Sequence, residues 1–483
     1  MALCSVASRR LSTHSARAVA ARAFSTAAPA APTPRFDPAV PHYDVVVVGG
    51  GVVGSALACQ LKSHPVFRAK RVAVIEPVAP SPFADAPDAR VFTLTPASQR
   101  LLQAAGAWAL IPSSDYAAFK DMQVWDALGD GFIRFDAQAV HRADLGHVVE
   151  HRVLVRALHE RMQQLTDATA AAVPLTLYCP ATVKHFQRPT VVSGLSEIGL
   201  EDGQRLKADV VVAADGGRSI VRTLAALGTW GWDYDQQAVV ATVKTDGGHA
   251  TAWQRFYPTG PVALLPMRDG YSSVVWSCSA DMAKELTALA PDEFVARLNE
   301  AFSAPSITPP PPEFPGLPVL SDLVKGVHHA ASTIMSAAAL MEPFVAPPRA
   351  VAAVGQRYSF PLKLKHATKY IKPGLALVGD SAHTIHPLAG QGLNLGLSDV
   401  QALSDLLVEG VKSGENLSSE YFLQQYEDER MKANITMQLA MDGFKRMFGP
   451  TPDAVAVARN VGMGTLNAVE PLKNQIMKYA MGL

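Results

Sequence analysis

The spacing of apolar residues in the first third of the chain predicts a parallel β-sheet with a helix between its strands. The run from Tyr43 to Val48 is short, β-branched and almost entirely apolar, which is typical of a strand buried on both faces. A helical pattern follows from Ser55 to Leu61, and a second strand-like run extends from Arg71 to Glu76. Strand, helix and strand in this order indicate a βαβ unit.

Stretches in the middle of the chain have a different pattern. The segments Ala238–Val243 and Ser272–Ser277 predict an antiparallel sheet that forms a second layer. A proline-rich segment at 305–318 indicates a long loop, whose role the sequence does not reveal. From Leu417 to the end of the sequence helical patterns dominate, and residues 467–472 break one helix into another.

The first 36 residues differ in composition from the rest. They are rich in Ala, Ser and Arg, and no acidic residue precedes Asp37. This composition predicts a mitochondrial transit peptide and disordered linker over residues 1–36. The segment Arg22–Ser25 resembles a matrix-processing site, so we expect cleavage near Phe24. A disordered tail or a plastid address has the same bias and stays open as an alternative.

Composition narrows the classes of partner. The chain holds 43 basic and 43 acidic residues, so its net charge predicts no nucleic-acid partner. The four cysteines are scattered and lack the close pairing of metal or redox sites. No uninterrupted run of about 18 apolar residues appears, so any membrane association is expected to be peripheral.

The turn after the first predicted strand carries a glycine fingerprint. Gly49 allows a tight turn, Gly51 lets the backbone approach a pyrophosphate, and Gly54 permits close packing of helix on strand. Glu76 ends the next strand, where a carboxylate can accept hydrogen bonds from ribose hydroxyls. These residues predict a dinucleotide site and disfavour a 2′-phosphate, which leaves FAD or NAD.

Two further motifs follow predicted strands. Asp215-Gly216 comes after a strand over 208–213, and Gly379-Asp380 comes after a strand over 375–378. The second motif continues through Pro387 into a glycine-rich loop that opens a helix near Gly392, flanked by Gly390 and Asn394.

In order and spacing, the three motifs resemble the signatures of the flavin-dependent aromatic hydroxylases, the family of p-hydroxybenzoate hydroxylase. The resemblance implies FAD as the cofactor, with Asp380 on its ribitol and Asp215-Gly216 near its pyrophosphate. It also implies cofactor contacts from Arg90 and from one of His151 and Arg152, and places Pro387 beside the isoalloxazine. The helix that begins near Gly392 would point its amide groups at the flavin pyrimidine edge. His383 and His386 have a spacing that suits a metal, but they lack Cys or carboxylate partners, so packing against the flavin is expected instead.

Three other segments resemble the ubiquinone-biosynthesis branch of this family: Trp253–Phe256 with Thr259–Pro266, Ser359–Leu362, and Asn467–Lys473. This resemblance implies hydroxylation at C5 of a polyprenylated 4-hydroxybenzoate ring, with O2 as oxidant and a C4a-hydroperoxyflavin as the oxygen donor. It further implies a ferredoxin and its reductase as electron donors. Other ubiquinone-biosynthesis proteins are expected in a membrane-associated complex on the matrix side of the inner mitochondrial membrane.

The expected architecture is α/β, with a Rossmann-like FAD-binding domain, a substrate domain built on a mixed and largely antiparallel sheet, and C-terminal helices. The FAD-binding domain is predicted over 40–120, 146–232 and 350–416. The substrate-binding domain takes 121–145 and 233–349, and the helical region takes 417–483.

Three alternatives to ring hydroxylation of this substrate stay open. They are a flavin hydroxylase or epoxidase of another substrate, a flavoprotein dehydrogenase, and a prenyl-binding chaperone of the same fold that works without FAD. If a ferredoxin is the donor, Lys363, Lys365, His366, Lys369 and Lys372 are candidates for a basic docking face, and an ordinary solvated strand pair is the alternative for these residues.

Overall fold

The computed structural model describes residues 40–79, 86–167, 173–190, 194–307 and 344–482, together with residues 319, 321 and 326. Residues Met1–Asp37 form a unit separate from Pro38–Leu483, and the described residues all belong to the second unit. The predicted transit peptide at 1–36 and most of the proline-rich segment at 305–318 lie outside the described residues.

The first sheet confirms the predicted βαβ unit and the Rossmann-like fold. Its order is β17-β18-β11-β1-β2-β8; in addition, β10 pairs antiparallel with β11, and β9 pairs antiparallel with β10. The four neighbours β18, β11, β1 and β2 are parallel, and Val45, Val46 and Val47 of β1 are fully buried. The strands of this sheet are β1 (His42–Val48), β2 (Val72–Ile75), β8 (Thr176–Tyr178), β9 (Val183–Gln187), β10 (Ser196–Leu200), β11 (Arg205–Ala213), β17 (Ile371–Lys372) and β18 (Leu375–Leu377).

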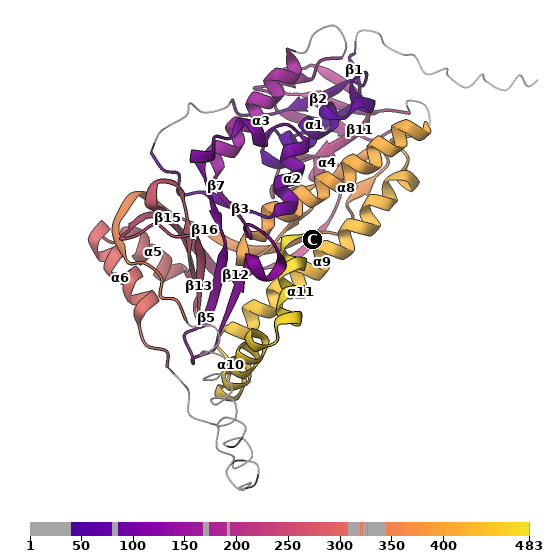
Figure 1. Cartoon of the computed structure of the whole chain (residues 1–483). Coiled ribbons are helices and arrows are strands. Elements are labelled where there is room, and N and C mark those ends of the chain that lie inside the picture. The colour runs from indigo at the N-terminus through magenta and orange to yellow at the C-terminus, as the bar shows by residue number, and fades with distance from the viewer. Residues whose placement is uncertain are drawn as a thin grey trace, which may run out of the picture. The chain divides into compact units, whose positions relative to one another are not determined.

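Helices surround the first sheet and share its apolar core (Figure 1). The helix α1 begins directly after the glycine turn and contacts α3 and α8. Buried apolar side chains of these helices complete the core, which removes a large apolar area from water. The helices are α1 (Val52–Ser63), α2 (Pro96–Ala104), α3 (His151–Thr166), α4 (Ile220–Leu224) and α8 (Gln391–Ser413).

The second sheet is mixed and largely antiparallel, as predicted. Its order is β19-β16-β12-β15-β14-β13-β5-β6, and only the pair β13–β5 is parallel. The helices α5 (Ala280–Ala288) and α6 (Pro291–Ser303) cover one face. The strands are β5 (Asp121–Asp126), β6 (Phe132–Asp136), β12 (Thr229–Thr245), β13 (Thr251–Tyr257), β14 (Gly260–Pro266), β15 (Tyr271–Ser279), β16 (Ala350–Ala367) and β19 (His383–Thr384).

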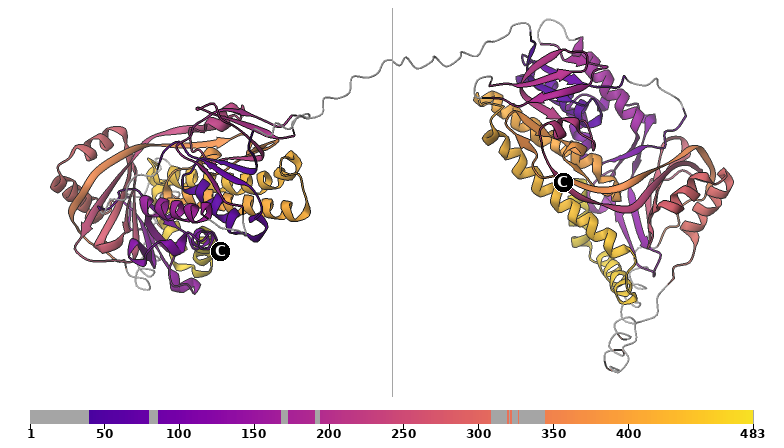
Figure 2. Two further views of the ribbon diagram at one scale, coloured as in Figure 1. Left: turned by 90° about the horizontal axis from the view of Figure 1, so that it is seen from above. Right: turned by 180° about the vertical axis from the view of Figure 1, so that it is seen from behind.

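The strands do not follow the predicted domain boundaries at 232/233 and 349/350. The strand β16 (Ala350–Ala367) pairs with β12 from Thr229 to Thr245, so both strands belong wholly to the second sheet (Figure 2). Residues 350–367 were expected in the FAD-binding domain. The physical reason is that β16 forms a long ladder of backbone hydrogen bonds with β12. This pairing places β16 in the second sheet, although β16 is close in sequence to the Gly379-Asp380 motif.

A third, three-stranded sheet has the order β3-β7-β4 and brings the start of α3 beside β3. Short 3-10 helices punctuate the connections. The strands are β3 (Val91–Leu94), β4 (Tyr116–Phe119) and β7 (Gly146–Glu150), and the 3-10 helices are η1 (Pro65–Phe67), η2 (Trp108–Leu110), η3 (Ser113–Asp115), η4 (Ala137–Val140), η5 (Arg268–Gly270), η6 (Gly379–Ser381) and η7 (Leu388–Gly390).

The end of the chain is helical, with α9 (Glu420–Phe448), α10 (Asp453–Ala468) and α11 (Glu470–Met481). The predicted break at 467–472 is present between α10 and α11. Both of these helices pack on β6. Within the described part of the chain, no helix combines the length and the hydropathy that crossing a membrane requires.

Candidate active site

The predicted cofactor segments meet at one edge of the first sheet. Gly49 follows β1, Glu76 follows β2, Asp215 follows β11 and Asp380 follows β18, and these four strands are parallel neighbours. Their carboxyl ends therefore lie together, which is where open α/β sheets bind ligands. A cavity of about 320 Å³ at this edge is lined by Val48, Gly49, Gly51, Ile75, Glu76, Pro77, Ala181, Thr182, Val183, Ala214, Asp215, Gly216 and Ile220.

The three glycines of the fingerprint are required for different physical reasons. A Cβ atom on Gly49 would lie 2.3 Å from the Ala214 carbonyl oxygen, and one on Gly54 would lie 1.9 Å from the Gly49 carbonyl oxygen. These two glycines allow strand and helix to pack. A Cβ atom on Gly51 would meet nothing within 4 Å, and Gly51 is the N-cap of α1. The backbone of Gly51 therefore borders open space at a helix N-terminus, which suits a pyrophosphate.

Glu76 lines the cavity directly beside the glycine turn. Its Oε2 accepts a hydrogen bond from the Gly50 amide at 2.6 Å, and its Oε1 accepts one from the Val78 amide at 3.0 Å. These two bonds orient the carboxylate. Because each carboxylate oxygen can accept more than one hydrogen bond, Glu76 can also receive ribose hydroxyls.

Asp215-Gly216 is joined to the second motif through Ser381, a residue that the sequence analysis did not single out. The Ser381 hydroxyl donates to Asp215 Oδ1 at 3.0 Å and accepts from the Gly216 amide at 2.9 Å. The other oxygen of Asp215 accepts from the amides of Ile220 and Val221 at the start of α4. Asp215 thus ties the turn after β11 both to α4 and to the turn after β18.

A buried carboxylate on α8 anchors the Gly379-Asp380 turn. Asp399 is fully buried, and its Oδ2 accepts from the Gly379 amide at 3.0 Å and from His383 Nε2 at 2.5 Å. Its Oδ1 accepts from Arg430 Nε at 2.9 Å and from Asn434 Nδ2 at 3.0 Å, both on α9. Burial opposes ionisation of Asp399, but these partners outweigh it and lower its pKa. Asp399 therefore remains a carboxylate that holds the turn in place.

The Asp380 side chain presents its carboxylate to solvent rather than to protein partners. Among the described residues, no hydrogen bond uses this carboxylate, although the turn that carries it is held firmly. The surrounding protein displaces part of its water and raises the pKa of Asp380, while His383 offsets part of the effect. A positioned carboxylate with open acceptor sites suits the hydroxyls of a ribitol chain.

The loop after Asp380 leads into α8 at a left-handed Gly390, with φ 63°. Pro387 is half-buried in this loop, and the amides of Gln391 and Gly392 lie in the first turn of α8. Asn394 was predicted to contact the cofactor, and its side chain instead bonds Thr95, Ser98, Thr93 and Gly390. Any contact from Asn394 to a flavin would therefore come through its backbone.

Arg90 and His151, both predicted as cofactor contacts, lie next to each other. The His151 amide donates to the Arg90 carbonyl at 2.8 Å, and its ring contacts Phe92 with centroids 5.6 Å apart. Burial lowers the pKa of His151, and Arg90 lowers it further. Arg152 turns to Glu150 instead, at 2.8 Å. Of the two residues between which the sequence did not decide, His151 is the one beside Arg90.

His383 and His386 do not share a partner. His383 binds Asp399, whereas the His386 ring packs edge-on against Tyr234 with centroids 5.1 Å apart. Across the residues that the structure describes, no three His, Cys, Asp or Glu side chains are arranged to hold a metal ion.

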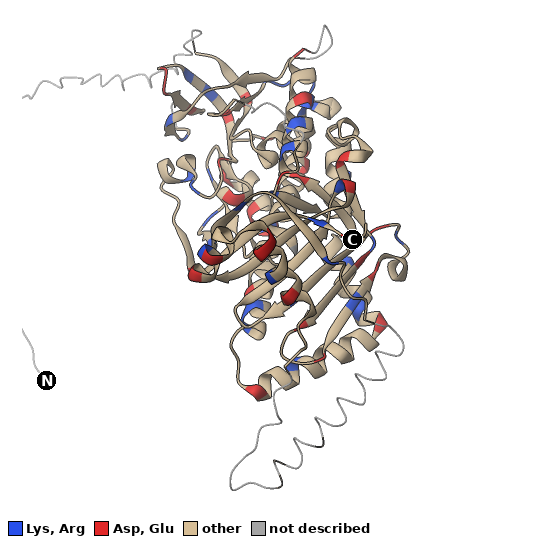
Figure 3. Ribbon diagram, turned by 90° about the vertical axis from the view of Figure 1, so that its left-hand side faces the viewer, with Lys and Arg blue, Asp and Glu red and all other residues tan. Residues whose placement is uncertain are grey.

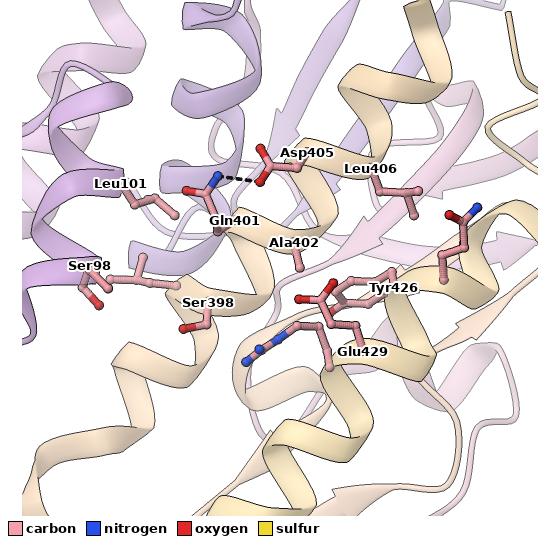
Figure 4. A pocket seen from close by; sticks show the side chains of 13 residues that line it. Ser98, Leu101, Ser398, Gln401, Ala402, Asp405, Leu406, Tyr426 and Glu429 are labelled. Carbon is pink, nitrogen blue, oxygen red and sulfur yellow. Dashed lines mark hydrogen bonds between the residues drawn. The ribbon is translucent and has the colours of Figure 1, made fainter. Parts of the chain in front are cut away.

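A larger cavity, of about 410 Å³, lies between α2, α8 and α9 and is separate from these motifs (Figure 4). On the α8 side of this cavity, Gln401 Nε2 donates a hydrogen bond to Asp405 Oδ2 at 2.8 Å. Tyr426 and Glu429 line the cavity from α9. None of the predicted cofactor residues lines it. The smaller cavity at the strand ends is therefore the one that fits a dinucleotide.

A Rossmann-like sheet with three cofactor motifs at its carboxyl edge, joined to a second antiparallel sheet, defines the fold of the flavin monooxygenases. The solved structures agree. A probable FAD-dependent monooxygenase of Pseudomonas aeruginosa, PqsL, superposes with a TM-score of 0.65 at 20% identity, covering 87% of this chain and 100% of that one. The p-nitrophenol 4-monooxygenase PnpA of Pseudomonas putida gives a TM-score of 0.65 at 18% identity, covering 92% and 99%.

Sequence comparison gives the family. The family described as FAD binding domain matches residues 42–329 and 321–439. The protein named "Ubiquinone biosynthesis monooxygenase COQ6, mitochondrial" of Xenopus tropicalis is 37% identical over 91% of this chain and 93% of its own length. The 3-demethoxyubiquinol 3-hydroxylase of Escherichia coli is 34% identical over 91% and 98%. The chain belongs to the ubiquinone-biosynthesis monooxygenases of the FAD-binding family, so the predicted fold class, family, FAD cofactor and monooxygenase class are confirmed.

Proposed function

We propose that this protein hydroxylates the ring of a polyprenylated 4-hydroxybenzoate intermediate of ubiquinone biosynthesis at C5, with O2 as the oxidant. The observation that carries the proposal is the cofactor site at the carboxyl edge of the first sheet, which has open space at Gly51 and an Asp380 carboxylate without a protein partner among the described residues. The chain that holds this site is similar to a ubiquinone-biosynthesis monooxygenase along 91% of its length. Bound FAD supplies the oxygen chemistry, which amino-acid side chains cannot perform.

The residues of the protein position the two reactants and exclude water. Gly51, Glu76 and Asp215 line the cavity for the nucleotide half, and Asp380 would take the ribitol hydroxyls. Leu388 follows Pro387 in the flavin loop and packs with Phe256 of β13 and Phe448 of α9. The rings of Phe256 and Phe448 stack with centroids 4.1 Å apart. This buried apolar cluster, which includes Leu388 of the flavin loop, keeps water away from that part of the loop.

The electron donor in this proposal is a ferredoxin served by a ferredoxin reductase. Its support is the single nucleotide fingerprint of the sequence, which FAD occupies, so that a reduced nicotinamide would have no second site of this kind. Basic and acidic residues are interspersed over the described chain (Figure 3). Each lysine of the predicted docking face has a partner within the protein: Lys363 with Asp233, Lys369 with Glu420, Lys365 with the Gly217 carbonyl and Lys372 with the Ala225 carbonyl.

These internal partners change how the donor should be tested. Reversing the lysine charges would disturb ion pairs inside the protein as well as any docking, so comparison of donors is the cleaner measurement. We expect reduced ferredoxin to reduce the bound FAD quickly under anaerobic conditions, with a rate that falls with salt. Fast, salt-insensitive reduction by NADPH alone would overturn the ferredoxin proposal and leave the hydroxylase proposal standing.

The proposed location is the matrix side of the inner mitochondrial membrane, where other ubiquinone-biosynthesis proteins would form a complex with this one. The support is the word mitochondrial in the names of the relatives, the composition of residues 1–36 and the apolar tail of the proposed substrate.

Labelled oxygen tests the reaction. The purified protein should be yellow, and after reduction it should insert one atom of labelled O2 into a prenylated 4-hydroxybenzoate, with much lower activity on soluble phenols. A colourless protein would favour the prenyl-binding chaperone. Ring oxidation without label would favour a dehydrogenase, and equal rates on soluble phenols would favour another hydroxylase.

A further inference from the structure

The helix α10 has an outer surface without charge. Its sequence contains two charged residues, Asp453 at the first position and Arg459. Arg459 is buried and forms an ion pair with Asp126. Surface helices of globular proteins normally carry charged residues on the side that faces water. The exposed positions of α10 after Asp453 are instead Ala454, Val455, Ala458, Gly462, Thr465 and Ala468.

The next helix continues this surface. Leu472, Ile476 and Tyr479 of α11 are spaced by four and three residues, so they lie on one side of the helix, and they are 40–59% exposed. Val469 connects the two helices and is also exposed. We call Val455, Val469, Leu472, Ile476 and Tyr479 the C-terminal apolar face.

Polar contacts on the inner sides hold both helices in this orientation. The Asn460 side chain bonds Asp126 at 2.9 Å and the Gly131 amide at 2.8 Å, and Asn467 accepts from the Arg134 amide at 2.9 Å. On α11 the opposite side, with Met477 and Met481, is buried. Since both helices turn their buried sides toward β6, their exposed sides face away from it together. The inner contacts of α10 and α11 therefore fix the orientation of both helices, and this orientation leaves the residues of the C-terminal apolar face exposed.

The inner side of α10 reaches the flavin loop. Met463 packs in the same cluster as Leu388, which follows Pro387, and as Phe256 and Phe448. The outer side of α10 is thus separated from this loop by the thickness of one helix, about 10–12 Å. Figures 1 and 2 show α10 and α11 beside the end of α9.

We propose that the C-terminal apolar face docks on the surface of a lipid bilayer and so delivers membrane-dissolved substrate to the flavin loop. The inference rests on the proposed function, because a polyprenyl tail stays in the bilayer while its ring must reach the flavin. Among the charged residues of 431–483 that are not buried, four are basic (Lys432, Lys445, Arg446 and Lys478) and two are acidic (Asp453 and Glu470), in a chain with no net charge, which suits anionic headgroups. Four of the five residues of the face are aliphatic, a class that includes the Val and Leu under-represented among protein-interface hot spots, and the fifth, Tyr479, is of a type enriched at membrane–water interfaces.

Binding to vesicles tests the docking without any substrate. The full-length holoprotein is mixed with vesicles of phosphatidylcholine and phosphatidylglycerol, and the bound fraction is measured by sedimentation. The double variant Leu472→Glu/Ile476→Glu should lower the partition coefficient at least about tenfold, since two apolar side chains lose their burial and two negative charges meet the headgroups. The matched control is Val351→Glu/Tyr421→Glu, which changes charge equally at exposed apolar positions of β16 and α9. It should bind like the wild type.

A second variant guards against a folding defect. Leu472→Trp should raise vesicle binding, because tryptophan favours the membrane interface, and all variants should keep the flavin content and thermal midpoint of the wild type. The proposal is overturned if the wild type does not bind vesicles, or if both double variants lose binding equally. It is also overturned if Leu472→Glu/Ile476→Glu instead dissociates a dimer in solution. Vesicle binding without hydroxylation of a detergent-dispersed prenylated substrate would refute the proposed function and leave the docking intact.

Discussion

Replacement of Gly51 by valine should separate cofactor binding from folding. Gly51 has an extended backbone, with φ −66° and ψ −176°, which valine adopts readily. No protein atom lies within 4 Å of the position that its Cβ would take. The apoprotein should therefore lose at most about 1 kcal/mol of stability, the cost of a poorer helix N-cap.

The same side chain should remove FAD from the site. It would occupy the space at the N-terminus of α1 where the pyrophosphate meets the backbone. If two charge-assisted hydrogen bonds of about 1.5–3 kcal/mol each are lost, the dissociation constant rises about 10²–10⁴-fold. Flavin absorbance per protein after gel filtration, followed by titration of the apoprotein with FAD, measures this loss.

Gly54→Ala is the matched control at the same turn. Its Cβ would lie 1.9 Å from the Gly49 carbonyl oxygen, so α1 would have to move away from β1. We expect destabilisation of the apoprotein at or above about 1–3 kcal/mol, the usual range for overpacking. The reasoning is refuted if Gly51→Val retains normal flavin, or if its apoprotein melts as early as that of Gly54→Ala.

Three further predictions concern titratable side chains near the flavin loop. Asp380→Asn should weaken FAD binding about 10–150-fold by titration. It should also stabilise the apoprotein at neutral pH, because the raised pKa of Asp380 means that its ionised form disfavours folding; in thermal melts this gain should shrink as pH falls below the raised pKa and vanish below the ordinary aspartate pKa. Asp399→Asn should cost about 3–5 kcal/mol in urea unfolding, because the buried Arg430 loses its ion pair; a loss under 1 kcal/mol would contradict the anchoring role. Burial lowers the pKa of His386 to about 4, so the unfolded state binds its proton more tightly, and stability should fall as pH drops from the ordinary histidine pKa toward 4. His386→Asn should flatten that part of the pH profile, and an unchanged profile would count against the buried neutral imidazole.

Much of the cofactor site could be predicted because its signals are local. A buried β-branched strand, a turn that needs glycine and a helix follow one another within 22 residues, from His42 to Ser63, and backbone sterics tie each residue type to its place. The same holds for Glu76, Asp215 and Asp380, each of which comes just after a strand. The parallel order of those strands then brings the residues to one edge.

The partners of these residues come from distant parts of the chain, and only the tertiary structure decided them. Ser381 bonds Asp215 across 166 residues, and Arg430 reaches Asp399 from a different helix. A hydrogen bond between such residues depends on how helices pack on sheets, and the local spacing of apolar and polar residues does not predict this packing. For the same reason, the sequence alone assigned residues 350–367 to the FAD-binding domain, although β16 pairs with β12 of the second sheet. It also offered Lys363 for a docking face, although Lys363 pairs with Asp233 on the neighbouring strand. The uncharged side of α10 is visible in the sequence, but its outward direction depends on Arg459 and Asn460 meeting Asp126 in the interior.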